Sequence, residues 1–212
     1  MTDQQRAIAG RFHRVYYNSG PSTWESTRWF GHRTLKNPMD LWTYQELIYQ
    51  LSPDLIVETG TFEGGSAYYF AMLMDLIDHG EIVTIDIEPR PGRPDHPRIT
   101  YLAGSSTDQS ILETVAARTQ DRKTVLVILD SDHSEAHVRA ELEAYWRFVT
   151  PGSYLVIEDT NVNGHPVFAQ HGPGPMEAVE AFLATTDEFE VDRTMERHLI
   201  TFNPNGWLRR RT

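Results

Sequence analysis

The stretch Val57-Glu58-Thr59-Gly60-Thr61-Phe62-Glu63-Gly64-Gly65-Ser66 decides the fold, because it has the pattern of a buried strand that runs into a glycine-rich turn and then a helix. Glycines in such a turn let the backbone approach a ligand closely, and the following helix offers free N–H groups to an anionic or polar group. Phe62 stands where the dinucleotide-binding pattern G-x-G-x-x-G has its second glycine. The turn is therefore of nucleotide type but departs from the NAD-binding pattern.

Short apolar runs alternate with longer amphipathic stretches from Asp54 onward, which is typical of strand–helix units on a mostly parallel sheet. The runs lack strict alternation, which indicates strands covered on both faces. We predict an α/β, Rossmann-like fold with a mostly parallel sheet, helices on both faces and an antiparallel C-terminal strand. The predicted strands are 55–57, 82–85, 99–102, 125–129 and 154–157, with closing strands at 189–191 and 198–202; the predicted helices, after one near the N-terminus, are 41–51, 66–78, 108–118, 134–148 and 175–184.

The composition limits what the chain can be. Its 212 residues, 40% of them hydrophobic, suffice for one compact domain but hardly for two. A net charge of -11 disfavours nucleic acid as a partner, since only Arg209–Arg211 forms a basic cluster. The absence of cysteine excludes disulfides, thiolate zinc sites, iron–sulfur clusters and a cysteine nucleophile. Any metal must therefore be bound by oxygen or imidazole ligands.

Residues 1–40 precede the predicted strand–helix units. Residues 1–20 contain no continuous hydrophobic segment for export, and no apolar run approaches the roughly 20 residues needed to span a bilayer. We therefore predict a soluble, cytoplasmic protein without a membrane span. An N-terminal helix and aromatic loop at 1–40 would serve as a lid or an oligomer contact, ahead of the main domain at 41–212. The long loop at 160–174 is a candidate lid or substrate loop.

An acidic residue ends the strand after the glycine turn. In Ile85-Asp86-Ile87-Glu88, Asp86 lies about 20 positions or more beyond the turn, where nucleotide-binding sheets hold a ribose diol. Together with the turn, this favours an adenosine-containing cofactor over a solvated carboxylate. Gly104-Ser105-Ser106 is small and polar enough to border the same cleft. The candidate cofactor-binding residues are Glu58, Gly60, Thr61, Gly64, Ser66, Asp86, Ser105, Ser106 and Asp130.

Carboxylates follow the next two strands, in Leu129-Asp130-Ser131-Asp132-His133 and in Ile157-Glu158-Asp159-Thr160. Because the carboxyl ends of parallel strands share one edge, we expect Asp130, Glu158 and Asp159 to converge beside the cofactor cleft. Crowded carboxylates repel one another, and a hard cation keeps them ionised, so the pattern predicts a Mg²⁺-like site. The alternative is that strand-end acids merely cap the following helices.

A histidine accompanies the first of these carboxylates. His133 titrates near neutrality and follows Asp130 closely, which suits a general base beside the metal. His137, and His165 and His171 in the loop at 160–174, are competitors. Trp24, Trp29 and Trp42 would suit a sugar-binding face, although aromatic residues near an N-terminus more often pack a core or an oligomer interface.

These motifs make the chain resemble the cephalosporin hydroxylase-like family, whose better-understood relatives are metal-dependent sugar O-methyltransferases that use S-adenosylmethionine. The resemblance covers about Leu35 to the C-terminus. It implies a class I methyltransferase fold for 41–212, with S-adenosylmethionine and Mg²⁺, or another divalent cation such as Mn²⁺, as cofactors. It rests on Lys36-Asn37-Pro38, Asp40-Leu41-Trp42, Tyr44-Gln45-Glu46, VETGTFEGGSA, LDSDHS, VIEDT and Gly172-Pro173-Gly174-Pro175.

The resemblance also implies roles for particular residues. In similar macrolide-sugar methyltransferases, an Asp after the fourth strand and an acidic pair after the fifth bind Mg²⁺, and a His three residues after the first Asp acts as base. Here that pattern implies metal ligation by Asp130, Glu158 and Asp159 and catalysis by His133. The candidate substrate contacts are Lys36, Trp42, Gln45, His165 and His171.

The implied reaction is O-methylation of a sugar hydroxyl of rhamnose or mannose type, in a glycoside, oligosaccharide, polysaccharide precursor or glycosylated natural product. The acidic surface and aromatic N-terminus are compatible with a homodimer. A catechol-type O-methyltransferase is an alternative, because it shares the metal chemistry. A non-catalytic, adenosine-cofactor-binding regulatory module is another. An Fe(II) oxygenase is disfavoured, since it needs two histidines and only one carboxylate.

Overall fold

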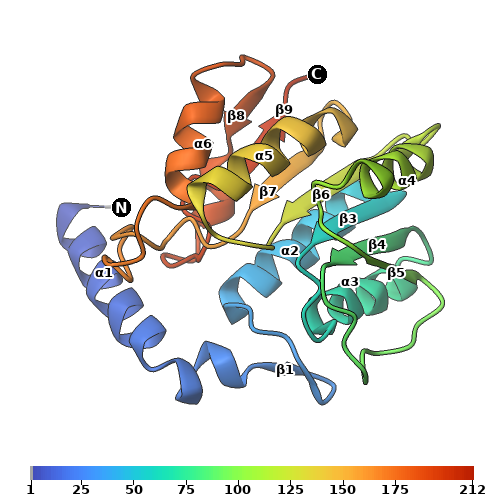
Figure 1. Cartoon of the computed structure of the whole chain (residues 1–212). Coiled ribbons are helices and arrows are strands. Elements are labelled where there is room, and N and C mark those ends of the chain that lie inside the picture. Colours follow the sequence, from blue (N-terminus) through green and yellow to red (C-terminus); the bar gives the residue numbers. More distant parts are fainter. Residues whose placement is uncertain (1) are drawn as a thin grey trace.

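The computed structural model describes residues 2–212; Met1, the first residue of the predicted N-terminal segment, lies outside them. At its centre is a seven-stranded sheet in the order β5-β4-β3-β6-β7-β9-β8 (Figure 1). The five strands from β5 to β7 are parallel, whereas β9 runs antiparallel to both its neighbours. The strands are β3 (Leu55–Thr59), β4 (Glu81–Asp86), β5 (Ile99–Ala103), β6 (Val125–Leu129), β7 (Tyr154–Ile157), β8 (Phe189–Val191) and β9 (Trp207–Arg210).

Helices cover both faces of this sheet (Figure 1). Successive residues of the central strands point to opposite sides, so Leu55 and Val57 pack with α4, α5 and α6, while Ile56 packs with α2 and α3. This arrangement confirms the predicted α/β fold. The helices are α2 (Pro38–Leu51), α3 (Gly65–Leu76), α4 (Gln109–Thr119), α5 (Glu135–Tyr145) and α6 (Pro175–Leu183), with short 3₁₀ turns η3 (Trp146–Phe148) and η4 (Arg193–Glu196).

The predicted closing strand at 198–202 is wrong, because the strand that pairs with β7 is β9. Residues 198–202 have the apolar and β-branched composition of a strand, but their backbone takes part in other contacts. The Phe202 N–H donates to the buried carboxylate of Asp40 at 2.8 Å instead of entering the sheet. A turn closed by the Gly206 N–H and the Asn203 carbonyl then leads into β9.

The N-terminal segment lies outside the sheet and its covering helices. It comprises α1 (Asp3–Asn18), the short turns η1 (Gly20–Ser22) and η2 (Trp24–Ser26), and a small hairpin of β1 (Arg28–Trp29) and β2 (His32–Arg33). Figure 1 shows α1 at the edge of the molecule, and the only residue it buries is His13. Across residues 2–212, none of the helices combines the length and the apolar character needed to cross a membrane.

Candidate active site

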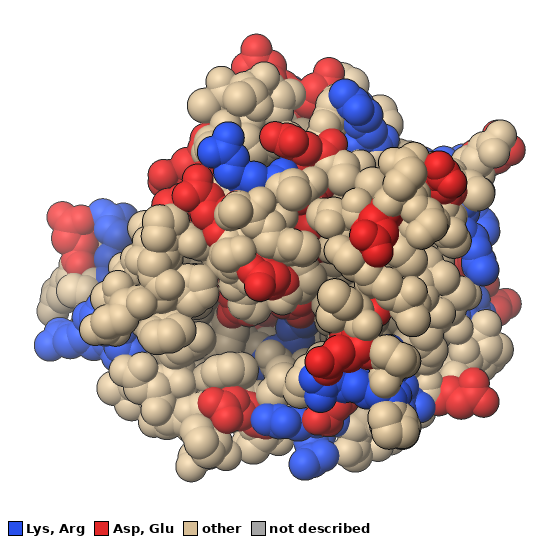
Figure 2. Space-filling model, in the orientation of Figure 1, with Lys and Arg blue, Asp and Glu red and all other residues tan. Residues whose placement is uncertain are grey.

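A cavity of about 770 Å³ opens at the carboxyl ends of β3, β4, β6 and β7. The chain reverses its order of strands between β3 and β6, which is where open α/β sheets bind ligands. Figure 2 shows the face of the molecule hollowed near its middle, with acidic and basic side chains in the hollow. The predicted site residues that line the cavity are Gly60, Thr61, Ser66, Asp86, Ser105, Ser106, Asp130, His133 and Asp159.

The glycines of the turn after β3 are required by contacts between backbones. Gly60 has φ +84°, and a Cβ there would lie 1.8 Å from the carbonyl oxygen of Asp130. A Cβ on Gly65 would lie 2.0 Å from the carbonyl oxygen of Arg33. The turn therefore packs directly against the end of β6 on one side and against β2 on the other, which fixes three parts of the cavity wall relative to one another.

Two predicted cofactor residues, Glu58 and Gly64, do not line this cavity. The Glu58 side chain is fully buried, where it accepts hydrogen bonds from the hydroxyls of Ser66 at 2.5 Å and Thr84 at 2.6 Å. Burial raises the pKa of Glu58 to about 7, although the charge of Lys36 opposes the rise. Glu58 thus supports the first turn of α3 from behind.

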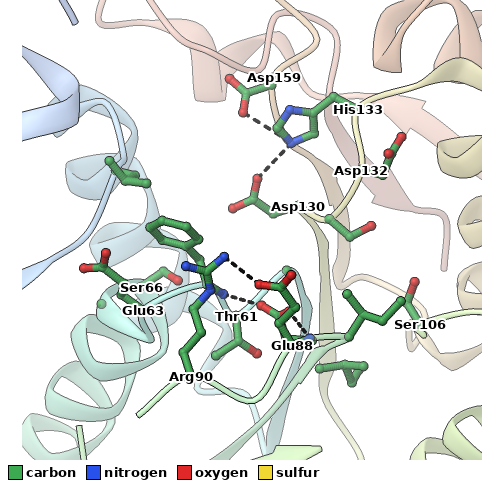
Figure 3. Close-up of a pocket in the computed structure, with 18 of the residues that line it drawn as sticks. Thr61, Glu63, Ser66, Glu88, Arg90, Ser106, Asp130, Asp132, His133 and Asp159 are labelled. Atoms are coloured by element: carbon green, nitrogen blue, oxygen red, sulfur yellow. Dashed lines mark hydrogen bonds and ion pairs between the residues drawn. The ribbon is translucent and has the colours of Figure 1, made fainter. Parts of the chain in front are cut away.

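Asp86 lies at the end of β4 and lines the cavity as predicted, but it is already engaged by the protein. Its Oδ2 accepts the Phe62 N–H at 2.6 Å and lies 3.2 Å from the guanidinium of Arg93. Beside it, the Arg90 guanidinium lies 4.5 Å from the centroid of the Phe62 ring. Arg90 also pairs with Glu88 at 2.9 Å (Figure 3). This end of the cavity is therefore rich in polar groups that suit a ribose.

The other end carries the acidic cluster, which we define as Asp130, His133 and Asp159. One ligand atom from each of these side chains lies within 4.8 Å of the other two. His133 Nε2 is 3.3 Å from Asp130 Oδ1 and 3.5 Å from Asp159 Oδ2 (Figure 3). The predicted convergence of the ends of β6 and β7 is thus present for these three residues.

The backbone places the two carboxylates of this cluster. The Asp130 N–H donates to the Thr59 carbonyl at 3.1 Å, which holds it against β3. Asp159 has a left-handed backbone with φ +55°, and its N–H donates to the side chain of the buried Asn203 at 3.0 Å. An aspartate tolerates this conformation better than most residues. It directs Asp159 into the cavity although its neighbour Glu158 points elsewhere.

The charged side chains of the acidic cluster shift one another's pKa values. Burial by itself would lower the pKa of His133, but the charges of Asp159 and Asp130 outweigh it and raise that pKa to about 9. Burial likewise favours the neutral form of Asp130, but Lys36 and His133 hold the pKa of Asp130 below its usual value. For Asp159, burial dominates and raises the pKa. Such opposed shifts within one cavity are characteristic of functional sites.

Glu158 lies outside the acidic cluster, and Lys36 explains why. Glu158 points into the protein, where it accepts a hydrogen bond from the Tyr44 hydroxyl and lies 3.1 Å from Lys36 Nζ. The same Nζ lies 2.5 Å from Asp130 Oδ2. Its contact with a substrate stays a prediction, since the Lys36 side chain is 4% exposed and does not line the cavity. It neutralises two buried carboxylates.

The donor set fits a divalent cation. Two carboxylates and an imidazole converge within the reach of one ion, and oxygen ligands are those that Mg²⁺ and Mn²⁺ prefer. A cation would also relieve the repulsion that crowded, buried carboxylates exert on each other. Asp130 and Asp159 are therefore the residues placed to hold it. Glu158 could join them only if its carboxylate left Lys36 and Tyr44.

The other predicted substrate residues do not line the cavity either. Trp42 is 59% exposed on α2 and donates a hydrogen bond to Glu46, and Gln45 is half-buried on the same helix. His165 pairs with Glu177 at 2.9 Å, and His171 packs against Phe168. No residue of the loop at 160–174 lines the cavity, and contact of these four residues with a substrate stays a prediction.

Tyr17 and Leu35 are among the cavity-lining residues that the sequence pattern did not select, and the pattern gave Trp24 no more weight than Trp29. Trp29 packs edge-on against Tyr69, with ring centroids 4.8 Å apart, and belongs to the core. Periodicity on α1 could have suggested Tyr17, since it lies four residues after the buried His13 and so on the same helix face.

The architecture is the class I methyltransferase fold, which similar solved structures share. The apo-structure of CmcI superposes with a TM-score of 0.68 at 24% identity, covering 89% of this chain and 77% of that one. The CmcI structure with Mg and SAM also gives 0.68, at 22% identity over 89% of this chain and 78% of that one. At these identities the likeness establishes the fold.

The sequence places the chain more narrowly. The family model described as "Rhamnosyl O-methyltransferase/CmcI" matches residues 21–211, and the chain belongs to this family. The rhamnosyl O-methyltransferase of Mycobacterium tuberculosis (strain H37Rv) is 39% identical over 95% of this chain and 84% of its own length. That of Mycobacterium leprae is 36% identical over 97% of this chain and 91% of its own length. The resemblance deduced from the motifs is thereby confirmed.

Proposed function

We propose that this protein transfers the methyl group of S-adenosylmethionine to a hydroxyl of a rhamnose- or mannose-type sugar, with His133 as general base. The protein is an S-adenosylmethionine-dependent sugar O-methyltransferase by family, and S-adenosylmethionine and Mg²⁺ are its cofactors. The observation that carries the finer proposal is the convergence of Asp130, His133 and Asp159 in the same cavity as the glycine turn.

The residues divide the cavity between two ligands. Asp86, Ser105 and Ser106 suit the ribose of the cofactor, whose sulfonium supplies an electrophilic methyl group. Asp130 and Asp159 would hold a divalent cation, which when bound lowers the pKa of a coordinated hydroxyl and stabilises negative charge on its oxygen. Glu158 stays a proposed ligand on the strength of the family pattern alone.

His133 is the residue placed to take the proton of the sugar hydroxyl. Its imidazole faces the cavity between the two carboxylates, and Asp130 orients the ring through Nε2. The charges of Asp159 and Asp130 raise the pKa of His133, so neutralising them with a cation favours the neutral imidazole that a base requires. Removal of the proton as the oxygen attacks leaves a methyl ether and S-adenosylhomocysteine.

The test is a turnover assay with defined acceptors. The protein is incubated with S-adenosylmethionine, Mg²⁺ and methyl α-L-rhamnoside, methyl α-D-mannoside or catechol, and methylated product is measured by mass spectrometry. We expect a singly methylated sugar, no product after chelation with EDTA, and recovery of activity when Mg²⁺ is returned.

The alternatives give different results in the same assay. Methylation of catechol without methylation of either sugar would support the catechol-type alternative and refute the sugar proposal. Binding of S-adenosylhomocysteine without turnover of any acceptor and without binding of a divalent metal would support a regulatory module. Full activity in EDTA would refute the role of the acidic cluster as a metal site.

Three attributes that accompany this activity stay predictions. We expect the protein to act in the cytoplasm, on a precursor of a polysaccharide or of another glycosylated product. We also expect a homodimer, with the segment at 1–40 as lid or contact. Light scattering of the purified chain, with and without residues 1–20, tests the last point directly.

A further inference from the structure

We propose that Tyr17 and Trp24, which we call the aromatic wall, form the surface on which the pyranose ring of the acceptor packs. The inference rests on the proposed function, because it names the acceptor subsite of that activity. Both residues line the cavity, and both come from the N-terminal segment and not from the sheet.

The aromatic wall lies at the end of the cavity that holds the acidic cluster. His13 Nε2, one helical turn before Tyr17 on α1, accepts a hydrogen bond of 3.0 Å from Asn161, and Asn161 follows Asp159 by two residues. Burial raises the pKa of Tyr17 to about 12, and the charge of Asp159 adds to the rise. An acceptor against Tyr17 therefore lies beside the carboxylate that points into the cavity.

Contacts within the protein hold the aromatic wall in place. The rings of Tyr17 and Trp24 are stacked, with centroids 5.3 Å apart and an interplanar angle of 22°. Phe202 supports both rings edge-on, at 5.5 Å from Tyr17 and 5.7 Å from Trp24. The buried carboxylate of Asp40 fixes Phe202 in turn, through the Phe202 N–H. A preformed surface loses little conformational entropy when a ligand binds.

The chemistry of the wall suits one face of a sugar. The Trp24 indole N–H already donates to the Tyr17 carbonyl at 3.0 Å, so the Trp24 ring offers apolar surface alone. A pyranose has a face of C–H groups and an edge of hydroxyls, and C–H groups pack on aromatic rings. Packing that face on the wall leaves the hydroxyl edge free to meet Asp159 and His133. The residues that suit a ribose follow β4 and β5, on the other side of β3 from the ends of β6 and β7.

The experiment compares Trp24→Ala, Tyr17→Ala and the milder Trp24→Phe with the matched control Tyr49→Ala, whose aromatic ring is exposed outside the cavity. For each protein we measure kcat and KM for methyl α-L-rhamnoside and methyl α-D-mannoside, and the Kd of S-adenosylhomocysteine by calorimetry. We expect KM to rise about tenfold in the two alanine variants and about threefold in Trp24→Phe. We expect unchanged kcat and cofactor Kd in these variants, and no change of any of the three quantities in Tyr49→Ala.

Several outcomes would overturn the inference. Unchanged KM in both alanine variants would mean that the wall does not touch the acceptor. A loss of S-adenosylhomocysteine affinity by the same factor as the rise in KM would assign the wall to the cofactor. If the alanine variants do not fold, an unchanged KM in Trp24→Phe would overturn the inference. If the unaltered protein methylates neither sugar, the proposed function itself fails, and this outcome is distinct from the results on the aromatic wall.

Discussion

The cavity has two walls that are held in place by different forces. The wall at the strand ends, with Asp130 and Asp159, is fixed by hydrogen bonds of the main chain and by buried charges. The aromatic wall of Tyr17 and Trp24, called the N-terminal wall below, is attached by ring contacts and by one buried hydrogen bond from Asn161 to His13. The groups proposed for chemistry thus lie on the more firmly held part.

The difference between the two walls affects which substitutions could change the acceptor that such an enzyme prefers. Reacting groups must keep their geometry within fractions of an ångström, and the central strands of a sheet provide that. A wall that only contacts the substrate tolerates larger changes of side chain. Changes at the strand ends should therefore remove activity or stability, whereas changes in the N-terminal wall should shift the acceptor that is preferred.

The largest effect is expected at the strand-end wall. His133→Ala removes the proposed base, and a positioned base contributes factors of about a hundred to ten thousand, so kcat should fall by about a thousandfold. Binding of S-adenosylhomocysteine should be unchanged, because the residues that suit its ribose lie elsewhere. The matched control is His79→Ala, since His79 pairs with Asp54 at the opposite end of β3. Retention of wild-type kcat by His133→Ala would contradict the assignment.

The strand-end wall was predictable from the sequence because it follows from topology alone. Parallel strands that end in Asp130 and Asp159 must bring these residues to one edge, whatever the packing around them. The same argument does not show where the Glu158 side chain points, since side chains of adjacent residues point to opposite sides, and the sequence does not show which of them meets Lys36.

The N-terminal wall depends on contacts distant in sequence, and periodicity could not supply them. Phe202 was assigned to a strand because its neighbours are apolar and β-branched, yet its ring supports Tyr17 and Trp24, more than 170 residues earlier in the chain. The role of Lys36 was missed for the same reason. A lysine is usually exposed, and only the fold shows that two carboxylates surround this one.

The second prediction tests whether buried charge holds the strand-end wall together. Lys36→Met should lower the free energy of unfolding by about 3–5 kcal/mol, because it leaves Asp130 and Glu158 buried without their cation. Chemical denaturation measures this loss. The double variant with Glu158→Gln should recover part of the stability, since it removes one of the unpaired charges. A Lys36→Met protein as stable as the wild type would show that the pair contributes nothing.

The third prediction concerns the single buried hydrogen bond of the N-terminal wall. Burial lowers the pKa of His13 from 6.5 to about 4. The folded state therefore takes up a proton on His13 only at a lower pH than the unfolded chain does. The stability from neutral His13 is complete above pH 6.5 and is lost as the pH falls towards 4, at about 1.4 kcal/mol for each pH unit.

Thermal unfolding between pH 7 and pH 4 measures this dependence. His13→Gln keeps a partner for Asn161 but does not titrate, so its stability should fall less steeply over this range than that of the wild type. Equal slopes in the two proteins would mean that His13 is not the group responsible.

The smallest effect is expected in the loop at 160–174, which joins the two walls through Asn161. Glu177 fastens this loop, accepting hydrogen bonds from the Gly174 N–H at 2.7 Å and from Asn163 and His165 at 2.9 Å each. Although burial opposes it, these bonds lower the pKa of Glu177 to about 2, so their contribution is present above pH 4.5 and is lost as the pH falls towards 2.

Glu177→Gln keeps an acceptor oxygen for these donors, so it should lower stability at pH 7 by only about 1 kcal/mol, while amide hydrogen exchange in the loop becomes faster. Glu180→Gln is the matched control, because Glu180 is exposed on the same helix. If exchange also quickens in α1, the loop carries the attachment of the N-terminal wall through His13 and Asn161. If exchange in α1 stays unchanged, the ring contacts of Phe202 hold that wall on their own, and the two walls are mechanically separate.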